Sequence, residues 1–266
     1  MPVIPVNGIR LNYEDTGQGE PVVLIQGTGG GRTVWQLHQV PALTAAGHRV
    51  ITFDNRGIPP TSECPEGFTL QDMVGDVAGL IERLGIGPCR VVGTSMGAFI
   101  AQELALARPE LVRQAVLMAT RGRTDAMRAR LTRAEIELHD SGVRLPTPYA
   151  AVLRALKSLS PRTLNDDREM ADWLDLFELS QPAGPGQRAQ MEVSNLDDRL
   201  AAYRGIRVPT LVMSFADDLI TPPHLGREVA DAIPGAEFTL VPDCGHYGYL
   251  EDPAAVNKEI VDFFAS

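Results

Sequence analysis

A serine between two glycines is the feature of this sequence with the clearest chemical meaning. The residues Gly93-Thr94-Ser95-Met96-Gly97 lie between an apolar, strand-like run and a helix-forming run over 98–107. A serine hydroxyl becomes a useful nucleophile when it is exposed and held in one geometry, and a sharp strand-to-helix turn provides both conditions. The turn also brings the Met96 N–H to a helix N-terminus, where it can face a developing oxyanion. The alternative is a turn in which Ser95 only caps the helix.

A serine nucleophile needs a base and an acid, and chain order limits the choice of both. His246 lies in a turn-rich loop between the strand-like run 237–241 and a final helical run over 253–264. Asp217 and Asp218 directly follow the buried-strand run that ends at residue 214. The order serine, aspartate, histidine is that of α/β-hydrolases and differs from the orders in chymotrypsin and subtilisin.

The chain resembles the α/β-hydrolases, and more closely the actinobacterial serine hydrolases known as cofactor-free, non-haem bromoperoxidases. In that family a proline follows the acid by four positions, which selects Asp218 because Pro222 follows it; Asp217 is the alternative. The family's oxyanion hole implies the N–H groups of Met96 and Thr28 here. The segments that carry the resemblance span most of the chain: Gly27-Thr28-Gly29-Gly30, Phe53-Asp54-Asn55-Arg56-Gly57, Gly93 to Gly97, Ala216 to Pro223 and Gly245-His246.

One position departs from the family pattern. The loop that carries Thr28 begins with Gln26-Gly27, where the family usually has His-Gly. Because the oxyanion hole is made from backbone amides, the change need not abolish it. We expect Gln26 to hydrogen-bond within the loop instead.

Strand-like and helical runs alternate along the chain. Continuous apolar runs are typical of parallel strands buried on both faces, so we predict an α/β-hydrolase fold with a doubly wound, mostly parallel, eight-stranded sheet. Residues 1–120 and 208–266 form the predicted core, and 121–207 form a helical lid inserted after the sixth strand. The predicted strands lie at Ile4-Val6, Leu11-Glu14, Val22-Gln26, Val50-Phe53, Arg90-Gly93, Ala115-Met118, Leu211-Ser214 and Glu237-Val241.

Four candidate residues, Ser95, Asp218, His246 and Thr28, fall just beyond strand ends, where parallel sheets form their crevice. In the family, an insertion after the sixth strand covers this crevice and sets the substrate pocket. Packing between lid helices is the alternative for each apolar residue of the insertion. Candidate pocket-lining residues are Trp173, Phe177, Met170, Tyr149 and Met191.

Other residues carry weaker signals. His224 competes with His246 as the base, but it lies too close in sequence to Asp218 to reach Ser95 comfortably. Cys244 lies near His246 but lacks the strand-turn-helix context, so we expect a buried, inert thiol.

Two further sites are disfavoured. Gly29-Gly30-Gly31 is followed by Arg32, not the Lys-Ser/Thr of a phosphate-binding loop. The remaining histidines lack acidic partners at metal-ligand spacing, so we predict neither a metal site nor a cofactor.

Two charged segments outside the candidate site also lead to expectations. Arg56, which follows the fourth strand, is expected to fix its loop by hydrogen bonds. Asp72 and Asp76 have helical spacing in an otherwise apolar helix, and we expect both to face solvent.

Composition excludes several classes of partner. The 266 residues carry 24 Lys+Arg against 34 Asp+Glu, a formal net charge of -10, which argues against nucleic acid and anionic membranes. No apolar run approaches the length of a membrane span, and the first residues lack the basic region of a signal peptide, so we expect a cytoplasmic protein. The three cysteines are an odd number and lack metal-ligand spacing, so we expect no disulfide framework.

The sequence therefore predicts a serine hydrolase that cleaves an ester, a thioester or a related acyl bond of a small molecule through an acyl-enzyme. Perhydrolysis, as in the cofactor-free haloperoxidases, and a lyase-type elimination remain alternatives that use the same pocket. A pocket that binds a small molecule without catalysis is the third possibility.

Overall fold

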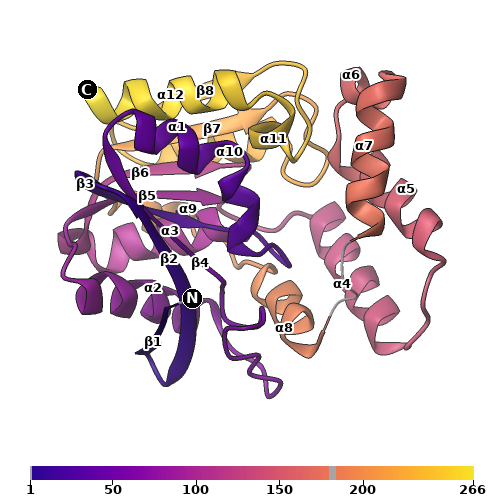
Figure 1. Cartoon of the computed structure of the whole chain (residues 1–266), viewed down its shortest axis with the longest axis horizontal. Coiled ribbons are helices and arrows are strands. Elements are labelled where there is room, and N and C mark those ends of the chain that lie inside the picture. The colour runs from indigo at the N-terminus through magenta and orange to yellow at the C-terminus, as the bar shows by residue number, and fades with distance from the viewer. Residues whose placement is uncertain (1, 180–183) are drawn as a thin grey trace.

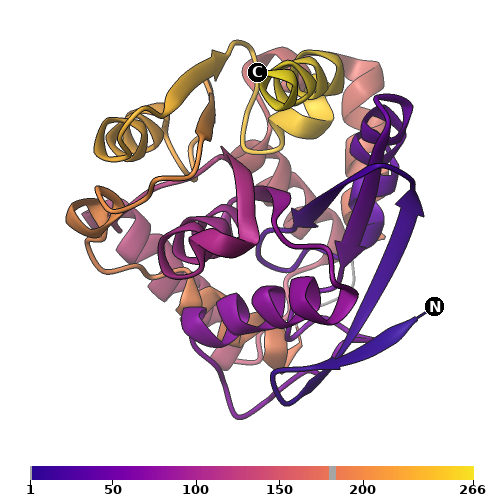
Figure 2. The same cartoon turned by 90° about the vertical axis from the view of Figure 1, so that its left-hand side faces the viewer.

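The computed structural model describes residues 2–179 and 184–266, and one eight-stranded sheet runs through it (Figures 1 and 2). The strand order is β1-β2-β4-β3-β5-β6-β7-β8. β2 is antiparallel to both of its neighbours, and the other pairs are parallel, as predicted. The strands are β1 (Val3–Val6), β2 (Ile9–Gly17), β3 (Glu20–Ile25), β4 (His48–Phe53), β5 (Cys89–Thr94), β6 (Val112–Met118), β7 (Thr210–Phe215) and β8 (Glu237–Val241).

Helices cover both faces of the sheet and form two hydrophobic clusters with it. Consecutive strand residues point to opposite faces, so Val91 packs in one cluster and Val92 in the other. The first cluster includes residues of α2, α3 and α10, and the second includes residues of α1 and α12. These helices are α1 (Gln39–Ala45), α2 (Leu70–Leu84), α3 (Met96–Ala107), α10 (Pro223–Ala232) and α12 (Pro253–Ala265). Three short elements complete the core: the 3₁₀ helices η1 (Arg32–Gln36) and η2 (Pro109–Leu111), and α11 (Gly248–Glu251).

The described part of the segment between β6 and β7 consists of helices joined by turns and irregular stretches, and it contains no strand. Its helices α5, α6 and α7 project to one side of the sheet in Figure 1 and form a small cluster of their own. By contrast, Val193, Leu196 and Tyr203 pack into the first core cluster. The helices are α4 (Ala126–Asp140), α5 (Thr147–Ser158), α6 (Pro161–Leu164), α7 (Asp167–Glu178), α8 (Pro185–Val193) and α9 (Leu200–Tyr203).

The expectation that Asp72 and Asp76 face solvent is wrong for Asp76, which is only 2% exposed. Arg56 Nε and Nη2 donate to its two carboxylate oxygens at 2.8 and 2.6 Å. A buried carboxylate requires such a partner, because burial without one is costly. Asp72 instead forms a capping box with Thr69 at the start of α2. The expected role of Arg56 in fixing its loop is confirmed.

Candidate active site

Ser95 lies at the turn between β5 and α3 in a conformation that is rare for a residue with a side chain. Its φ is 54° and its ψ is -121°, which costs on the order of 1–3 kcal/mol. A Cβ at Gly93 would collide with the Gly97 carbonyl, and one at Gly97 would collide with the Ile25 carbonyl. The two glycines therefore let α3 start against the ends of β5 and β3, with Ser95 at the apex.

Two backbone amides near this serine make no hydrogen bond within the described residues. In the loop after β3, the Gly27 N–H donates to Gln26 Oε1 at 2.8 Å and the Gly29 N–H to Gln190 Oε1 at 2.8 Å. The N–H groups of Thr28 and Met96 donate to no acceptor within the described residues. Gln26 thus makes the loop hydrogen bond expected of it. The assignment of the Thr28 and Met96 amides to an oxyanion hole stays a prediction.

His246 and Asp218 are joined by a buried hydrogen bond. His246 Nδ1 lies 2.8 Å from Asp218 Oδ2, and these residues are 7% and 2% exposed. Asp218 also accepts the N–H groups of Ile220 and Thr221 at 2.8 Å each, and the Thr221 hydroxyl at 2.6 Å. Burial would raise the pKa of Asp218, but the opposing effects of His246 and Thr221 hold it below its usual value.

The ionised state of Asp218 determines the tautomer of the histidine. A carboxylate only accepts hydrogen bonds, so the proton at this contact lies on His246 Nδ1. His246 Nε2 is then the nitrogen left as a proton acceptor. Among the described hydrogen bonds, none reaches the side chain of Asp217, and His224 is exposed at the start of α10.

The serine and the histidine follow strands of the same parallel set. Ser95 follows β5, Asp218 follows β7 and His246 follows β8, in the spatial order β5-β6-β7-β8. No hydrogen bond joins Ser95 Oγ to His246 among the residues that the structure describes. Hydrogen bonds of this kind often tighten only when substrate is bound.

The insertion holds the loop that carries Thr28. Gln190 of α8 is fully buried, accepts the Gly29 N–H and donates to the Arg56 carbonyl at 2.7 Å. One turn later, Ser194 Oγ lies 3.1 Å from Thr28 Oγ1. The end of α8 therefore fixes the loop at both Thr28 and Gly29.

A second contact joins the insertion to the histidine loop through Glu251. Its Oε1 accepts the Ser160 N–H at 2.8 Å and the hydroxyls of Ser160 and Thr163 at 2.7 Å each. Its Oε2 accepts the N–H of Gly245 at 2.7 Å, one residue before His246. One carboxylate thus ties the start of α6 to the segment that positions the histidine.

An aromatic cluster lies beside the histidine. The Tyr247 ring stacks on Trp173 with a 6.1 Å centroid distance and a 9° interplanar angle, and it lies 6.0 Å from Phe177. The guanidinium of Arg154 lies over the Phe177 ring and donates to the Tyr247 hydroxyl at 2.9 Å.

The predicted pocket-lining residues divide between this cluster and other positions. Met170, Trp173 and Phe177 pack in the cluster of α5 to α7. Tyr149 is 55% exposed near the start of α5 and takes no part in it. Met191 lies half-buried on α8.

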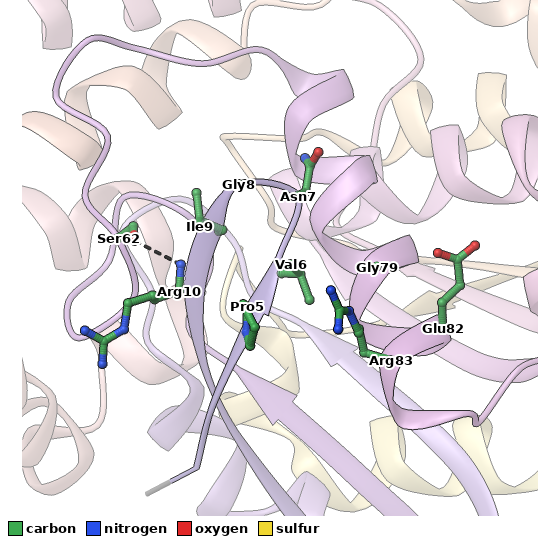
Figure 3. A pocket seen from close by; sticks show the side chains of 10 residues that line it. All are labelled: Pro5, Val6, Asn7, Gly8, Ile9, Arg10, Ser62, Gly79, Glu82 and Arg83. Atoms are coloured by element: carbon green, nitrogen blue, oxygen red, sulfur yellow. Dashed lines mark hydrogen bonds between the residues drawn. The ribbon is translucent and has the colours of Figure 1, made fainter.

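Two of the grooves on the described surface lie apart from Ser95 and His246, neither of which lines them. One of about 790 Å³ lies beside the β1–β2 hairpin and α2, with Arg10 and Arg83 on either side of the hairpin (Figure 3). The other, of about 290 Å³, lies between η1 and α7 and is lined partly by Trp173 and Glu251. The second groove therefore borders the aromatic cluster beside the histidine.

Three other features considered in the sequence are a reactive cysteine, a metal site and a membrane span. Burial, followed by the effect of nearby carboxylates, raises the pKa of the Cys244 thiol to about 12, which keeps it protonated. No cluster of three or more metal-ligating side chains occurs in residues 2–179 and 184–266. No helix in the same ranges is long and apolar enough to cross a membrane.

Several residues at this site escaped the sequence analysis. Thr221 follows Asp218 by three positions, a spacing at which an aspartate commonly accepts a backbone N–H, so its role had a local signal. Gln190 and Glu251 had none, because their partners lie 161 and 91 residues away in the chain.

Comparison with known proteins shows the family to which the chain belongs. Residues 22–259 match the model of the "Alpha/beta hydrolase family". A protein of Mycobacterium tuberculosis H37Rv named "Putative non-heme bromoperoxidase BpoC" is 55% identical over 97% of this chain and 98% of its own length, and its crystal structure superposes with a TM-score of 0.93 over 96% of this chain and 95% of its own. The enol-lactonase of Burkholderia xenovorans LB400 is 29% identical with a TM-score of 0.82, and both chains are fully covered. An esterase of Thermogutta terrifontis is 27% identical with a TM-score of 0.85, covering 100% of this chain and 98% of its own. The chain therefore belongs to the alpha/beta hydrolase family.

Proposed function

We propose that this protein is a serine hydrolase that cleaves an ester, a thioester or a related acyl bond of a small molecule. The observation that carries the proposal is the buried hydrogen bond between His246 and Asp218, at the same edge of the sheet as the strained Ser95. A histidine paired with an aspartate, together with a half-buried serine at the same edge of the sheet, constitutes the apparatus of acyl transfer. The esterase and the enol-lactonase among the structural neighbours support this class of reaction.

In the first half-reaction, Ser95 Oγ attacks the carbonyl carbon while His246 Nε2 takes its proton. Asp218 holds the imidazole in the required tautomer and stabilises the imidazolium that forms. The N–H groups of Thr28 and Met96 receive the negative charge on the carbonyl oxygen. Each such donor contributes about 3–4 kcal/mol to lowering the barrier.

His246 then returns the proton to the leaving group, and the carbon–oxygen or carbon–sulfur bond to that group breaks. Water attacks the acyl-enzyme with His246 again as the base, which releases the acid and restores Ser95. The aromatic cluster of Trp173, Phe177 and Tyr247 provides an apolar wall beside the histidine. We assign to it the binding of the apolar part of the substrate.

Two measurements test this proposal. A fluorophosphonate probe should label the wild-type protein at Ser95 and leave Ser95→Ala unlabelled. A panel of 4-nitrophenyl esters of rising acyl length, assayed beside acyl thioesters, should show turnover that depends on Ser95. Labelling at another residue, or equal turnover by Ser95→Ala, would show that the nucleophile is wrongly assigned.

A second candidate reaction is perhydrolysis, favoured by the name of the bromoperoxidase relative that is 55% identical. Hydrogen peroxide would replace water in attacking the acyl-enzyme, giving a peracid and free Ser95; the peracid would then oxidise bromide. Product analysis with and without peroxide separates the two reactions. Peracid formed faster than carboxylic acid at equal concentrations of peroxide and ester would favour perhydrolysis.

A further inference from the structure

The residues directly after β6 are held in a defined conformation next to the candidate site. Ala119, the residue after β6, has a φ of 48°. Gln102 of α3, fully buried, contacts the Thr120 hydroxyl and donates to the Arg121 carbonyl at 3.2 Å. The backbone of Arg121 is thereby held against α3, the helix that begins at Ser95.

The Arg121 side chain lies among the residues of the candidate site. Its guanidinium carbon is 5.2 Å from the centroid of Phe99, one helical turn after Ser95. Its Nη2 donates to the Ser194 carbonyl at 2.7 Å, and the Ser194 hydroxyl contacts that of Thr28. Arg121 therefore lies close to the start of α3, which follows Ser95, and to the loop that carries Thr28, although it is only 4% exposed.

A second buried arginine lies in the first turn of α4. Arg128 is 9% exposed, and α4 packs against α8. Its backbone N–H donates to the N-cap Asp125 at 2.8 Å, while its Nη1 lies at a longer 3.4 Å from the same carboxylate. Burial, with the neighbouring charge of Arg128, lowers the pKa of Arg121 to about 10, so the two cations interact.

Neither buried arginine is closely paired with a carboxylate. The charges of Asp125 and of the ionised Asp218 offset those of Arg121 and Arg128. Among the described hydrogen bonds, however, the guanidinium of Arg121 reaches no carboxylate, and that of Arg128 reaches only Asp125, at 3.4 Å. A buried guanidinium without a closely bonded anion is costly, so its free N–H groups favour one.

Hydrogen-bond donors are also left over. Arg121 Nε, Arg128 Nε and the Thr124 hydroxyl are buried without a partner in the described part of the protein. Guanidinium N–H groups form a planar fork that matches a carboxylate. Three unsatisfied donors within eight residues of chain, at the entrance to the insertion, are more than a well-packed interior usually leaves.

We propose that Arg121 and Arg128, with Thr124, form a subsite for a carboxylate carried by the substrate. This inference rests on the proposed hydrolase function, because it assigns part of the substrate of the same site. The substrate class is then an ester, thioester or related acyl compound with a free carboxylate, which the subsite orients while Ser95 attacks the acyl carbon.

The test compares esters that differ only in whether their carboxylate is free. One pair carries it on the acyl side, 4-nitrophenyl hydrogen glutarate and its methyl ester, and the other on the leaving group, 4-acetoxybenzoate and its methyl ester. We expect kcat/KM for the acid to exceed that for its methyl ester by about tenfold or more in at least one pair. In that pair, Arg121→Gln and Arg128→Gln should each lower the acid-to-ester ratio by about tenfold.

Arg123→Gln is the matched control, because it removes a positive charge from the same segment but from a pair with Glu228 on the surface. It should leave the acid-to-ester ratio unchanged. A ratio near one in both pairs for the wild type, or a preference that survives both buried substitutions, overturns the carboxylate subsite. Such a result would leave the hydrolase proposal intact, whereas absence of Ser95 labelling would overturn that proposal itself.

A binding measurement keeps the subsite testable if a buried variant fails to fold or if no ester is turned over. In calorimetry on the wild-type protein, glutarate should bind at least about tenfold more tightly than glutaramide, which has the same shape and no charge. Equal affinities would show that the orphaned donors are satisfied by water alone and would overturn the proposal.

Discussion

The 2.8 Å hydrogen bond between His246 Nδ1 and Asp218 Oδ2 is formed by a carboxylate that its own loop already holds in place. The N–H groups of Ile220 and Thr221 and the Thr221 hydroxyl fix both carboxylate oxygens. The histidine therefore meets a pre-oriented acceptor, and the adjacent Asp217 has no equivalent contact among the described residues.

This arrangement predicts very different effects for the two neighbouring aspartates. Asp218→Asn should lower kcat about ten-thousandfold, because an amide donor facing Nδ1 favours the wrong imidazole tautomer. Asp217→Asn, the matched control, should change kcat by less than about threefold. Steady-state kinetics on the best 4-nitrophenyl ester measure both. The reverse ranking would move the acid to Asp217.

Ser95 and His246 should act as a unit. Either residue changed to Ala should remove nearly all turnover, on the order of a millionfold, and the double variant should be no worse than the single ones. Circular dichroism should show an intact fold in each. If purified Ser95→Ala kept more than a few per cent of the wild-type rate on the best substrate, the mechanism proposed above would be untenable.

The aromatic cluster should set acyl preference. Trp173→Ala or Phe177→Ala should shift the preferred acyl length and raise KM more than it lowers kcat, since these side chains bind ground and transition states alike. The loss of substrate-binding free energy should reach at most about 3 kcal/mol per side chain. Tyr149→Ala is the control, because Tyr149 is 55% exposed and should leave the chain-length profile unchanged. A profile that moves equally in all three variants would argue against the cluster as the acyl site.

Glu251 should act as a positioning residue. Glu251→Gln replaces an acceptor of four hydrogen bonds by an amide whose NH₂ group faces donors, so the Gly245 segment loses its anchor. We expect kcat to fall about 10- to 100-fold and KM to change little, with slower fluorophosphonate labelling of Ser95. Glu259→Gln, which removes one contact to Thr239, is the control. A fall in thermal stability with unchanged labelling and kcat would reduce Glu251 to a structural role.

Gln190 should stabilise the loop that carries Thr28, the residue proposed to form part of the oxyanion hole. Gln190→Met has a similar shape but leaves the Gly29 N–H and the Arg56 carbonyl unpartnered, at about 1–3 kcal/mol of unfolding free energy for each. Because the Thr28 amide is next to Gly29, kcat should fall as well, by about tenfold. Gln71→Met on exposed α2 surface is the control. A variant less stable but with full kcat would mean that the loop keeps its shape without Gln190.

Most of the fold could be predicted because the apolar residues of each strand indicate on which faces it is buried. Val91 and Val92 enter different clusters, so β5 has no polar alternation and reads as a parallel strand. Strand direction was harder at the edge. The pair Asn7-Gly8, with φ angles of 43° and 78°, is the local signal for the antiparallel turn between β1 and β2.

The parts of the site that the sequence did not predict depend on contacts between distant segments. Asp76 has helical spacing typical of a solvated face, and only the approach of Arg56 from another loop makes its burial favourable. Glu251 and Gln190 are ordinary polar residues until the insertion folds back on the core. The strand-to-helix turn at Ser95 can be predicted from neighbouring residues. The partners of Glu251 and Gln190 are distant in the chain and become apparent only in the folded structure.

The insertion contacts the candidate active site at two separate places. Gln190 and Ser194 hold the loop that carries Thr28, and Ser160 and Thr163 contact the His246 loop through Glu251. The segment is therefore not an interchangeable module. Grafting residues 121–207 from a relative should therefore change turnover together with selectivity, unless Glu251 and the Thr28 loop are exchanged with the segment.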